Sequence, residues 1–444
     1  MSTLRRPLRV AVLVGLSACG GHPAAPPGPP PETPEPDAAM PGVPTGVPDA
    51  AAVTPPPILP DAAAASPDQP SMPPPAGGSQ VVVEAGTLDR ENTIVAFPFA
   101  GGAGKSFLLR DGQGGQLPLQ VHENGQAVFV LPSLKAGQQA SFTLQEGASP
   151  TGVTAMREAD GVRLAVGGTT VFRYQTMGKL PGGVGQNYLR GGYIHPLLTP
   201  AGVLVTDDYP GDHRHHHGIW SAWAHTHFEG REMDFWNMGG GSAKVDFQSL
   251  ASSWDGPVHA GFRAHHLFTD LRGNKTALNE EWIVTVYKVA PAYFVFDLDS
   301  TQEAASASPV NLDQYLYGGF AFRGSAQWRS GATFVTSEGK DRGSGDGTTA
   351  RWCYIGGKVD GKMAGYAVLG HPSNFRAPQP MRINPTDPYF SFSPVKPGGF
   401  PIVQGKPFVS RFRFVVTDGE PDKALYDRVW NDYATPPKVS VRAN

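Results

Sequence analysis

Short runs of β-branched and aromatic residues fill this chain from Val81 onward, and each run is bounded by glycine, proline or aspartate. Representative runs are VRLAVGG, NEEWIVTVYKV, AYFVFDLDS and FVSRFRFVVTDG. Such runs are typical of β-strands, and no internal repeat relates them as it would in a propeller. The sequence therefore predicts an all-β protein. We expect a large antiparallel β-sandwich over 151–437 and a small β-sandwich domain over 79–150.

The clearest helical spacing lies near the end of the chain, in PDKALYDRVWNDYA at 421–434. Apolar residues recur there every three or four positions, which is the period of a helix with one buried face. The residues that would share this face are Leu425, Tyr426, Val429, Trp430 and Tyr433. We expect a helix here, followed by a short tail at 438–444.

The first 18 residues predict export and are not expected to be part of the fold. Arginines precede an apolar run that is too short to cross a bilayer, which is the pattern of a signal peptide. The tetrapeptide LSAC that ends at Cys19 resembles a bacterial lipoprotein cleavage box. We expect cleavage of 1–18 and lipid attachment to Cys19, which would anchor the protein to the outer membrane or the periplasmic face. An ordinary secretory signal cut nearby is the alternative.

Residues 19–78 are rich in proline, alanine and glycine and hold nearly half of the chain's 44 prolines. Large apolar residues are almost absent there, so the segment cannot bury a core of its own. Proline-rich chain favours extended polyproline conformations. We therefore expect a disordered tether between the lipid and the folded part, with binding to the cell wall as the alternative.

Charge and cysteine content narrow the set of partners. The chain has a formal net charge of −3 at pH 7 and no basic stretch, which argues against binding to nucleic acid. It has two cysteines, so Cys353 has no disulfide partner once Cys19 carries a lipid. Downstream of the signal peptide, the sequence has no apolar run long enough to span a bilayer. The lipid is therefore the only membrane contact that we expect.

Histidines crowd into one part of the chain, DHRHHHGIWSAWAHTHFEG. Six of the 13 histidines stand there, namely His213, His215, His216, His217, His225 and His227. If the stretch is extended, alternate side chains share one face. The functional candidates at the odd positions are then His213, His215, His217, Trp223, His225, His227 and Glu229. We expect this face to line a polar cleft.

Imidazole is both a common metal ligand and a proton carrier near neutral pH. The candidate ligands for one divalent transition metal are His213, His215 and His217, because neighbouring rings on one strand face could tilt toward one ion. The candidate catalytic residues are His215, His217, His225, His227 and Glu229. Two other interpretations stay open, namely metal-free acid–base catalysis with hydrogen bonding to a sugar, and a purely structural polar row.

Other polar and aromatic residues could bind a sugar. Tryptophan faces stack on sugar rings, and we expect Trp223, on the histidine face, to be such a platform, whereas Trp220 is expected in the core. The candidate substrate-binding residues are Trp223, His195, Asp234, Asn237, Arg323 and His371. The sequence has no GxSxG elbow, P-loop or dinucleotide fingerprint, which argues against serine-nucleophile and nucleotide chemistry.

The stretch GGYIHPLLTPAGVLVTDDYPGDHRHHHGIW, with EMDFWNMG after it, resembles a family of exported bacterial proteins labelled "methane oxygenase PmoA". The ending FVSRFRFVVTDGEPDKALYDRVWNDYA is similar to the end of that family, so the resemblance covers roughly 155–435. The family in turn resembles large supersandwich, galactose-mutarotase-like folds that act on sugars, such as aldose epimerases and certain polysaccharide lyases. The resemblance implies a carbohydrate site lined by histidines, and the label implies copper-dependent oxidation.

Together these features predict a surface or periplasmic lipoprotein that acts on an oligo- or polysaccharide. The expected reaction is that of a glycan lyase, hydrolase or epimerase. Removal of a proton next to a carbonyl or uronate would best use a histidine-lined site that is assisted by a metal. The alternatives are a non-catalytic glycan-binding lipoprotein and a copper-dependent oxygenase.

Overall fold

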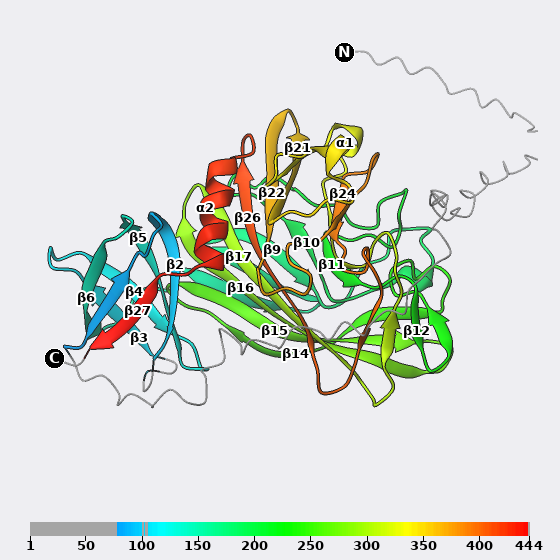
Figure 1. Ribbon diagram of the computed structural model, residues 1–444, viewed down its shortest axis with the longest axis horizontal. Coiled ribbons are helices and arrows are strands. Elements are labelled where there is room, and N and C mark those ends of the chain that lie inside the picture. Colours follow the sequence, from blue (N-terminus) through cyan, green and yellow to red (C-terminus); the bar gives the residue numbers. More distant parts are fainter. Residues whose placement is uncertain (1–77, 100–101, 103–104, 443–444) are drawn as a thin grey trace, which may run out of the picture. The chain divides into compact units, whose positions relative to one another are not determined.

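The structure is a computed structural model that describes residues 78–99, 102 and 105–442 (Figure 1). Within these residues almost all regular structure is β-strand, and every strand pairs antiparallel with its neighbours, which confirms the predicted all-β fold. The signal peptide predicted at 1–18, the lipidation predicted at Cys19 and the tether predicted up to residue 77 lie outside the described residues. None of the described helices is long and apolar enough to cross a membrane.

Two eight-stranded antiparallel sheets form the large β-sandwich. The first, here called the site sheet, has the order β23 (Met381–Ile383), β24 (Tyr389–Phe392), β19 (Gly319–Arg323), β11 (Ile219–Ala222), β10 (Tyr193–Leu197), β9 (Thr169–Gln175), β8 (Gly161–Val166) and β7 (Val153–Glu158). The second, here called the long sheet, has the order β14 (Ala243–Trp254), β15 (His259–Asp270), β16 (Lys275–Ala290), β17 (Tyr293–Ala304), β26 (Phe408–Asp418), β22 (Lys362–Gly370), β21 (Trp352–Val359) and β20 (Thr333–Thr336).

The main hydrophobic core lies between these two sheets. Strands of the long sheet alternate buried and partly exposed residues, as in β17, because successive side chains point to opposite faces. Aromatic rings from the two sheets meet in the middle. The ring centroids of Trp282 and Phe320 are 5.5 Å apart, and those of Phe322 and Phe414 are 5.7 Å apart. Both sheets contribute to one continuous cluster of buried residues, so the predicted sandwich is confirmed.

A four-stranded sheet caps one end of the long sheet. Its order is β13 (Arg231–Met233), β12 (Thr226–Phe228), β18 (Val310–Leu312) and β25 (Phe400–Ile402). Its buried side chains, such as Phe228 and Leu312, share a hydrophobic cluster with Val245 and Phe268 of the long sheet. This four-stranded cap shares no strand with the site sheet. Histidines that belong to the cap therefore lie in a different part of the fold from histidines beside the site sheet.

A seven-stranded sheet forms a second module with its own core. Its order is β2 (Arg90–Pro98), β5 (Gln126–Leu134), β4 (Gln116–Val121), β3 (Ser106–Arg110), β6 (Gln139–Glu146), β1 (Gln80–Glu84) and β27 (Lys438–Arg442). The sequence analysis leaves 438–444 as a tail, but β27 pairs with β1 along its whole length. Val439 and Val441 of β27 pack against the core of this module, and a run of five residues is too short to predict such a strand by itself.

Short helices complete the fold: the 3₁₀ turns η1 (Gln186–Tyr188) and η2 (Arg329–Gly331), α1 (Arg342–Gly345) and α2 (Lys423–Ala434). Helix α2 confirms the helix expected at 421–434. Asp422 caps it by accepting a hydrogen bond from the Leu425 backbone N–H. Leu425, Tyr426 and Val429 pack on the outer face of the long sheet, as the apolar stripe predicts.

Candidate functional site

The histidine-rich stretch is not one extended segment, so the expected alternation from 213 to 229 is wrong. Its residues divide among an irregular loop, strand β11 of the site sheet and strand β12 of the four-stranded cap. His225 and Glu229, which both follow β11 in the chain, have left-handed backbone conformations, with φ of 38° and 49°. Such residues turn the chain, and the histidines therefore separate into two groups.

The first group lies in a tight loop at 207–218, here called the histidine loop. The loop closes on itself because the Tyr209 N–H donates to the His216 carbonyl at 3.1 Å and the His216 N–H donates to the His213 carbonyl at 2.9 Å. Tyr209 has a φ of 48°, which is costly for a bulky residue and is typically kept only where the surrounding structure demands it. The loop thus holds its side chains in fixed and different directions.

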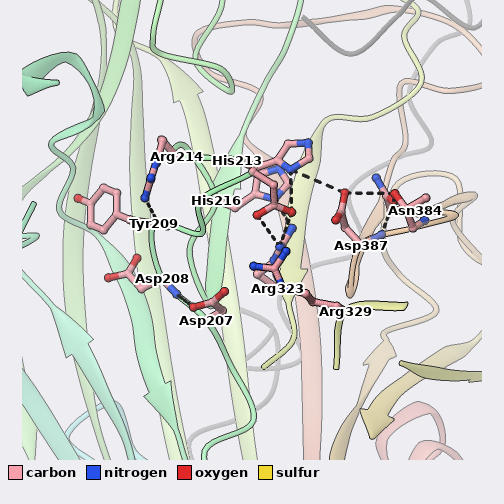
Figure 2. A network of polar contacts seen from close by, with 12 residues as sticks. Asp207, Asp208, Tyr209, His213, Arg214, His216, Arg323, Arg329, Asn384 and Asp387 are labelled. Carbon is pink, nitrogen blue, oxygen red and sulfur yellow. Dashed lines mark hydrogen bonds and ion pairs between the residues drawn. The ribbon is translucent and has the colours of Figure 1, made fainter. Parts of the chain in front are cut away.

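Arg323, the last residue of β19, fixes Asp212 of this loop. The Arg323 Nη2 donates to both Asp212 carboxylate oxygens, at 3.0 and 2.8 Å, and its Nη1 lies 3.4 Å from the His216 Nδ1 (Figure 2). Arg323 is only 1% exposed. The sequence predicted that Arg323 binds substrate, whereas the structure places it beneath the loop as a support for Asp212.

Asp212, His213 and Asp387 converge next to this contact, and Figure 2 shows His213 and Asp387 joined above Arg323. The His213 Nδ1 lies 3.4 Å from an Asp212 oxygen and 3.7 Å from an Asp387 oxygen. One ligand atom from each residue lies within 4.8 Å of the other two. The side chains are between 16% and 25% exposed, so a ligand can reach them. This set could hold either a shared proton or a divalent cation.

The two carboxyl groups have opposite protonation preferences. Burial raises the pKa of Asp212, but hydrogen bonds with His213, Asp387 and Arg323 together lower this pKa far below its ordinary value. Burial and the hydrogen bond with Asp212 raise the pKa of Asp387. Asp212 is therefore the group of the pair that ionises first, and Asp387 keeps its proton more readily.

The β23–β24 hairpin brings Asp387 to this point from far along the chain. The Asn384 Oδ1 accepts hydrogen bonds from the backbone N–H groups of Thr386 and Asp387, at 2.9 and 2.7 Å. This is an Asx turn, which orders the loop NPTDP. The sequence analysis missed Asp387; the turn signal was present, but nothing local links it to the histidine loop.

His217 faces away from this cluster and pairs with Asp208. Its Nδ1 lies 2.6 Å from an Asp208 oxygen, and the Tyr193 hydroxyl donates to the other oxygen at 2.9 Å. The Tyr193 and His217 rings stack at 4.2 Å. The His217 side chain is fully buried, and its Nε2 has no hydrogen-bond partner within the part of the chain that the structure describes. Burial lowers the pKa of His217 against the opposing effect of Asp208, so the imidazole is neutral at pH 7.

His215 and His216 complete the loop. The His216 ring stacks on His213 at 4.5 Å and lies 4.6 Å from Tyr389 and 5.0 Å from Trp220. His215 meets the His216 ring edge-on at 4.6 Å. Burial lowers the pKa of both His215 and His216 well below the ordinary value. The neutral imidazoles of His215 and His216, of which His216 packs on Tyr389 and Trp220, therefore lie beside the carboxyl groups of Asp212 and Asp387.

His195, on β10, borders the same region of the site sheet. Its Nδ1 lies 3.0 Å from the Thr206 Oγ1, and burial lowers its pKa, with a smaller contribution from His217. The structure thus brings His213, His215 and His217 into one loop with His195 nearby, but the first three rings do not form the predicted metal set. His213 joins Asp212 and Asp387 instead.

The second histidine group sits on the four-stranded cap. The His225 and His227 side chains are 43% and 44% exposed, and their Nδ1 atoms lie 3.4 Å and 3.1 Å from carboxylate oxygens of Glu232 and Asp313. Glu229 binds Lys275 at 2.6 Å. His225, His227 and Glu229 lie on or beside the four-stranded cap and contact groups near it. The histidine loop instead precedes β11 of the site sheet. The structure does not unite the five predicted catalytic residues.

The other predicted substrate-binding residues serve local structure. Trp223 is only 1% exposed and donates a hydrogen bond to the Gln302 side chain at 2.8 Å. Asp234 accepts hydrogen bonds from the backbone N–H groups of Trp236 and Asn237 and from the Asn237 amide. His371 binds its neighbour Ser373. The ring of Trp223 is thus part of the core and offers no platform to a sugar.

Comparison with known proteins bears on the region that carries the site. No curated protein matches the chain. A family model matches residues 161–431, a range that includes the histidine loop, Arg323 and Asp387. The chain therefore belongs to the family of unknown function DUF6807.

Proposed function

We propose that this protein is an enzyme that acts on carbohydrate by proton transfer at Asp212, His213 and Asp387. The observation that carries the proposal is the convergence of two carboxyl groups and one imidazole at a point that solvent can reach. One carboxyl group can accept a proton while the other donates one. General acid–base catalysis needs both roles within hydrogen-bond reach of the reacting atoms.

The spacing of the carboxyl groups favours elimination or isomerisation over direct hydrolysis. Glycosidases place their two carboxyl groups about 5–5.5 Å apart when they retain configuration and farther apart when they invert it. Ligand oxygens of Asp212 and Asp387 lie within 4.8 Å of each other, which is closer than either glycosidase spacing. A lyase or an epimerase that removes a proton next to a carbonyl or uronate fits this arrangement better.

The carbohydrate assignment draws on the surroundings of the pair. The carboxyl groups and imidazoles at the cluster could hydrogen-bond the hydroxyl groups of a sugar, whereas the buried rings of Tyr389 and Trp220 beside His216 support the loop from within. The resemblance to the family labelled "methane oxygenase PmoA", and through it to sandwich enzymes that act on sugars, supports the same substrate class. We propose an oligo- or polysaccharide as substrate and no nucleic-acid partner.

The proposed location is the cell envelope. Cleavage of 1–18 and lipidation of Cys19 would anchor the chain, and the proline-rich residues that follow would act as a tether. The lipid would be the protein's only attachment to the membrane. A glycan outside the inner membrane would then be within reach of the folded part.

The test is a screen of oligosaccharides and uronate-containing glycans in D₂O, which detects both elimination products and deuterium incorporation. The wild type is expected to exchange or eliminate a substrate proton, and Asp387→Asn, which leaves the Arg323–Asp212 pair intact, is expected to lose this activity while it stays folded. Asp360→Asn is the matched control, because Asp360 is exposed and has a φ of 49° that asparagine tolerates. Retention of a glycan without turnover would instead indicate a binding protein. Copper- and reductant-dependent oxygen uptake would indicate the oxygenase that the label implies.

A further inference from the structure

We propose that Asp212, His213 and Asp387 together bind one divalent transition-metal ion. The inference rests on the proposed function and deepens it, because it assigns a cofactor to the same site; with the ion bound, the three residues would act as ligands and a metal-bound water would carry the proton in their place. It replaces the set of three histidines that the sequence suggested with a mixed set of one nitrogen and two oxygen ligands.

The distances between the three groups match those around a metal ion. Ligands that each lie about 2.0–2.2 Å from a tetrahedral ion are separated from one another by roughly 3.4 Å. The His213 Nδ1 lies 3.4 Å from the Asp212 oxygen and 3.7 Å from the Asp387 oxygen. Two of the three separations are thus already close to those around one ion, and the Asp212 and Asp387 oxygens lie within 4.8 Å of each other.

His215 supplies a second, independent observation. Its side chain is more than nine-tenths buried, at 7% exposed, and no hydrogen bond found among the described residues involves its ring. The ring meets His213 edge-on at 5.6 Å. The ring nitrogens of His215 are not among the buried atoms that lack a partner, so solvent reaches them and the ring is open to a ligand beside the cluster. It could complete the coordination or bind a group that the ion carries.

Neighbouring residues already orient the ligands as the outer shell of a metal site does. Arg323 holds both Asp212 oxygens from below, and Asn384 fixes the backbone of Asp387. Such outer contacts fix ligand orientation in metal proteins. Metal binding would displace the proton of Asp387, and the two carboxylates beside one guanidinium would then leave a net negative charge for a cation.

The ligand types select the class of metal. One imidazole with two carboxylates suits zinc, manganese or ferrous iron better than magnesium or calcium, which prefer oxygen ligands alone. Three protein ligands with partly exposed side chains leave a coordination position open, which is the feature of a catalytic site. An ion bound here would polarise a carbonyl or carboxylate oxygen of the sugar.

The inference is tested by equilibrium dialysis of the untagged full-length protein against Zn²⁺ and, separately, Mn²⁺, with metal content measured by mass spectrometry. We expect one ion per chain. Asp387→Asn and His213→Ala should each weaken binding by at least about tenfold. The double variant His225→Ala, His227→Ala should bind like the wild type, because these exposed histidines lie on the four-stranded cap. Near-UV circular dichroism checks the fold, and the isosteric Asp387→Asn keeps the test valid if His213→Ala unfolds.

Two outcomes would overturn the inference. One is the absence of binding in the wild type, and the other is binding that the cap variant loses and the Asp387→Asn variant keeps. The result is separable from the proposed function. Turnover that survives metal removal would contradict the role of the metal and support the proposed enzyme activity. A bound metal without any carbohydrate turnover would support the metal site and contradict the proposed enzyme activity.

Discussion

Arg323 and Asp212 are joined by two charge-assisted hydrogen bonds, in which one guanidinium nitrogen reaches both carboxylate oxygens at 3.0 and 2.8 Å. Arg323 ends a strand of the site sheet, and Asp212 belongs to the histidine loop. The contact therefore ties an irregular loop to a rigid element. Because Arg323 is buried, breaking the pair leaves a charge that solvent cannot compensate.

Replacing Arg323 with lysine keeps the charge but removes the planar fork that holds Asp212. We expect Arg323→Lys to lower the free energy of unfolding by about 1.5–3 kcal/mol, measured by urea denaturation. Arg163→Lys is the control, because Arg163 forms a partly exposed pair with Glu158, and it should cost no more than about 1 kcal/mol. Equal losses in the two variants would show that Arg323 does not anchor the loop.

Asp208 accepts hydrogen bonds from both Tyr193 and His217. Asp208→Asn should lower the free energy of unfolding by about 1–3 kcal/mol, and Tyr193→Phe should lower it by about 1 kcal/mol. Since the two residues are partners, the double variant should lose less than the sum of the single losses. Additive losses in urea denaturation would mean that the Tyr193–Asp208 bond contributes nothing to stability.

Trp223 was expected to bind a sugar, but the structure places its ring in the core, and stability measurements can test this placement. Its ring is buried among apolar residues of the cap, so Trp223→Ala should destabilise the protein by about 3–5 kcal/mol. Thermal and urea unfolding measure this loss. A variant that kept its stability but lost affinity for glycans would restore Trp223 as a ligand platform.

His259 links stability to pH outside the site. Its Nδ1 accepts a hydrogen bond from the Trp254 indole at 3.0 Å, and burial lowers its pKa to about 3 from an ordinary 6.5. Below pH 6.5 His259 is protonated in the unfolded state but stays neutral in the folded state. The free energy of unfolding therefore falls as the pH falls from 6.5 toward 3. His259→Gln keeps an acceptor but no titratable group. Between pH 7.5 and pH 5 the wild type should lose up to about 2 kcal/mol more than this variant, and parallel losses would contradict the assignment.

Local sequence patterns predicted the fold well, because strand and helix periods are local properties. The runs that became β16, β17 and β26 have alternating or β-branched residues that read as strands without any tertiary information. Helix α2 was equally visible from its apolar spacing. Strand β27 was not, because its pairing with β1 joins the two ends of the described chain.

The site was predicted only in part, because its geometry depends on the backbone between the histidines. The sequence placed His213 in a site, but the alternation argument assumed extended chain where Tyr209 and His225 have left-handed conformations. It therefore united the two histidine groups that the sheets separate. Asp387 could not be predicted, because only the pairing of β24 with β19 brings it beside residues far earlier in the chain.

The most direct measurement of the central claim is the turnover number of Asp387→Asn on a glycan that the wild type converts, with Asp360→Asn measured in parallel. Asp387 should contribute as an acid–base group does, so its amide variant should lose about 10²- to 10⁴-fold in kcat, while Asp360→Asn keeps wild-type activity. An Asp387→Asn enzyme that converts the glycan as fast as the wild type would show that the cluster of Asp212, His213 and Asp387 is not the reacting centre.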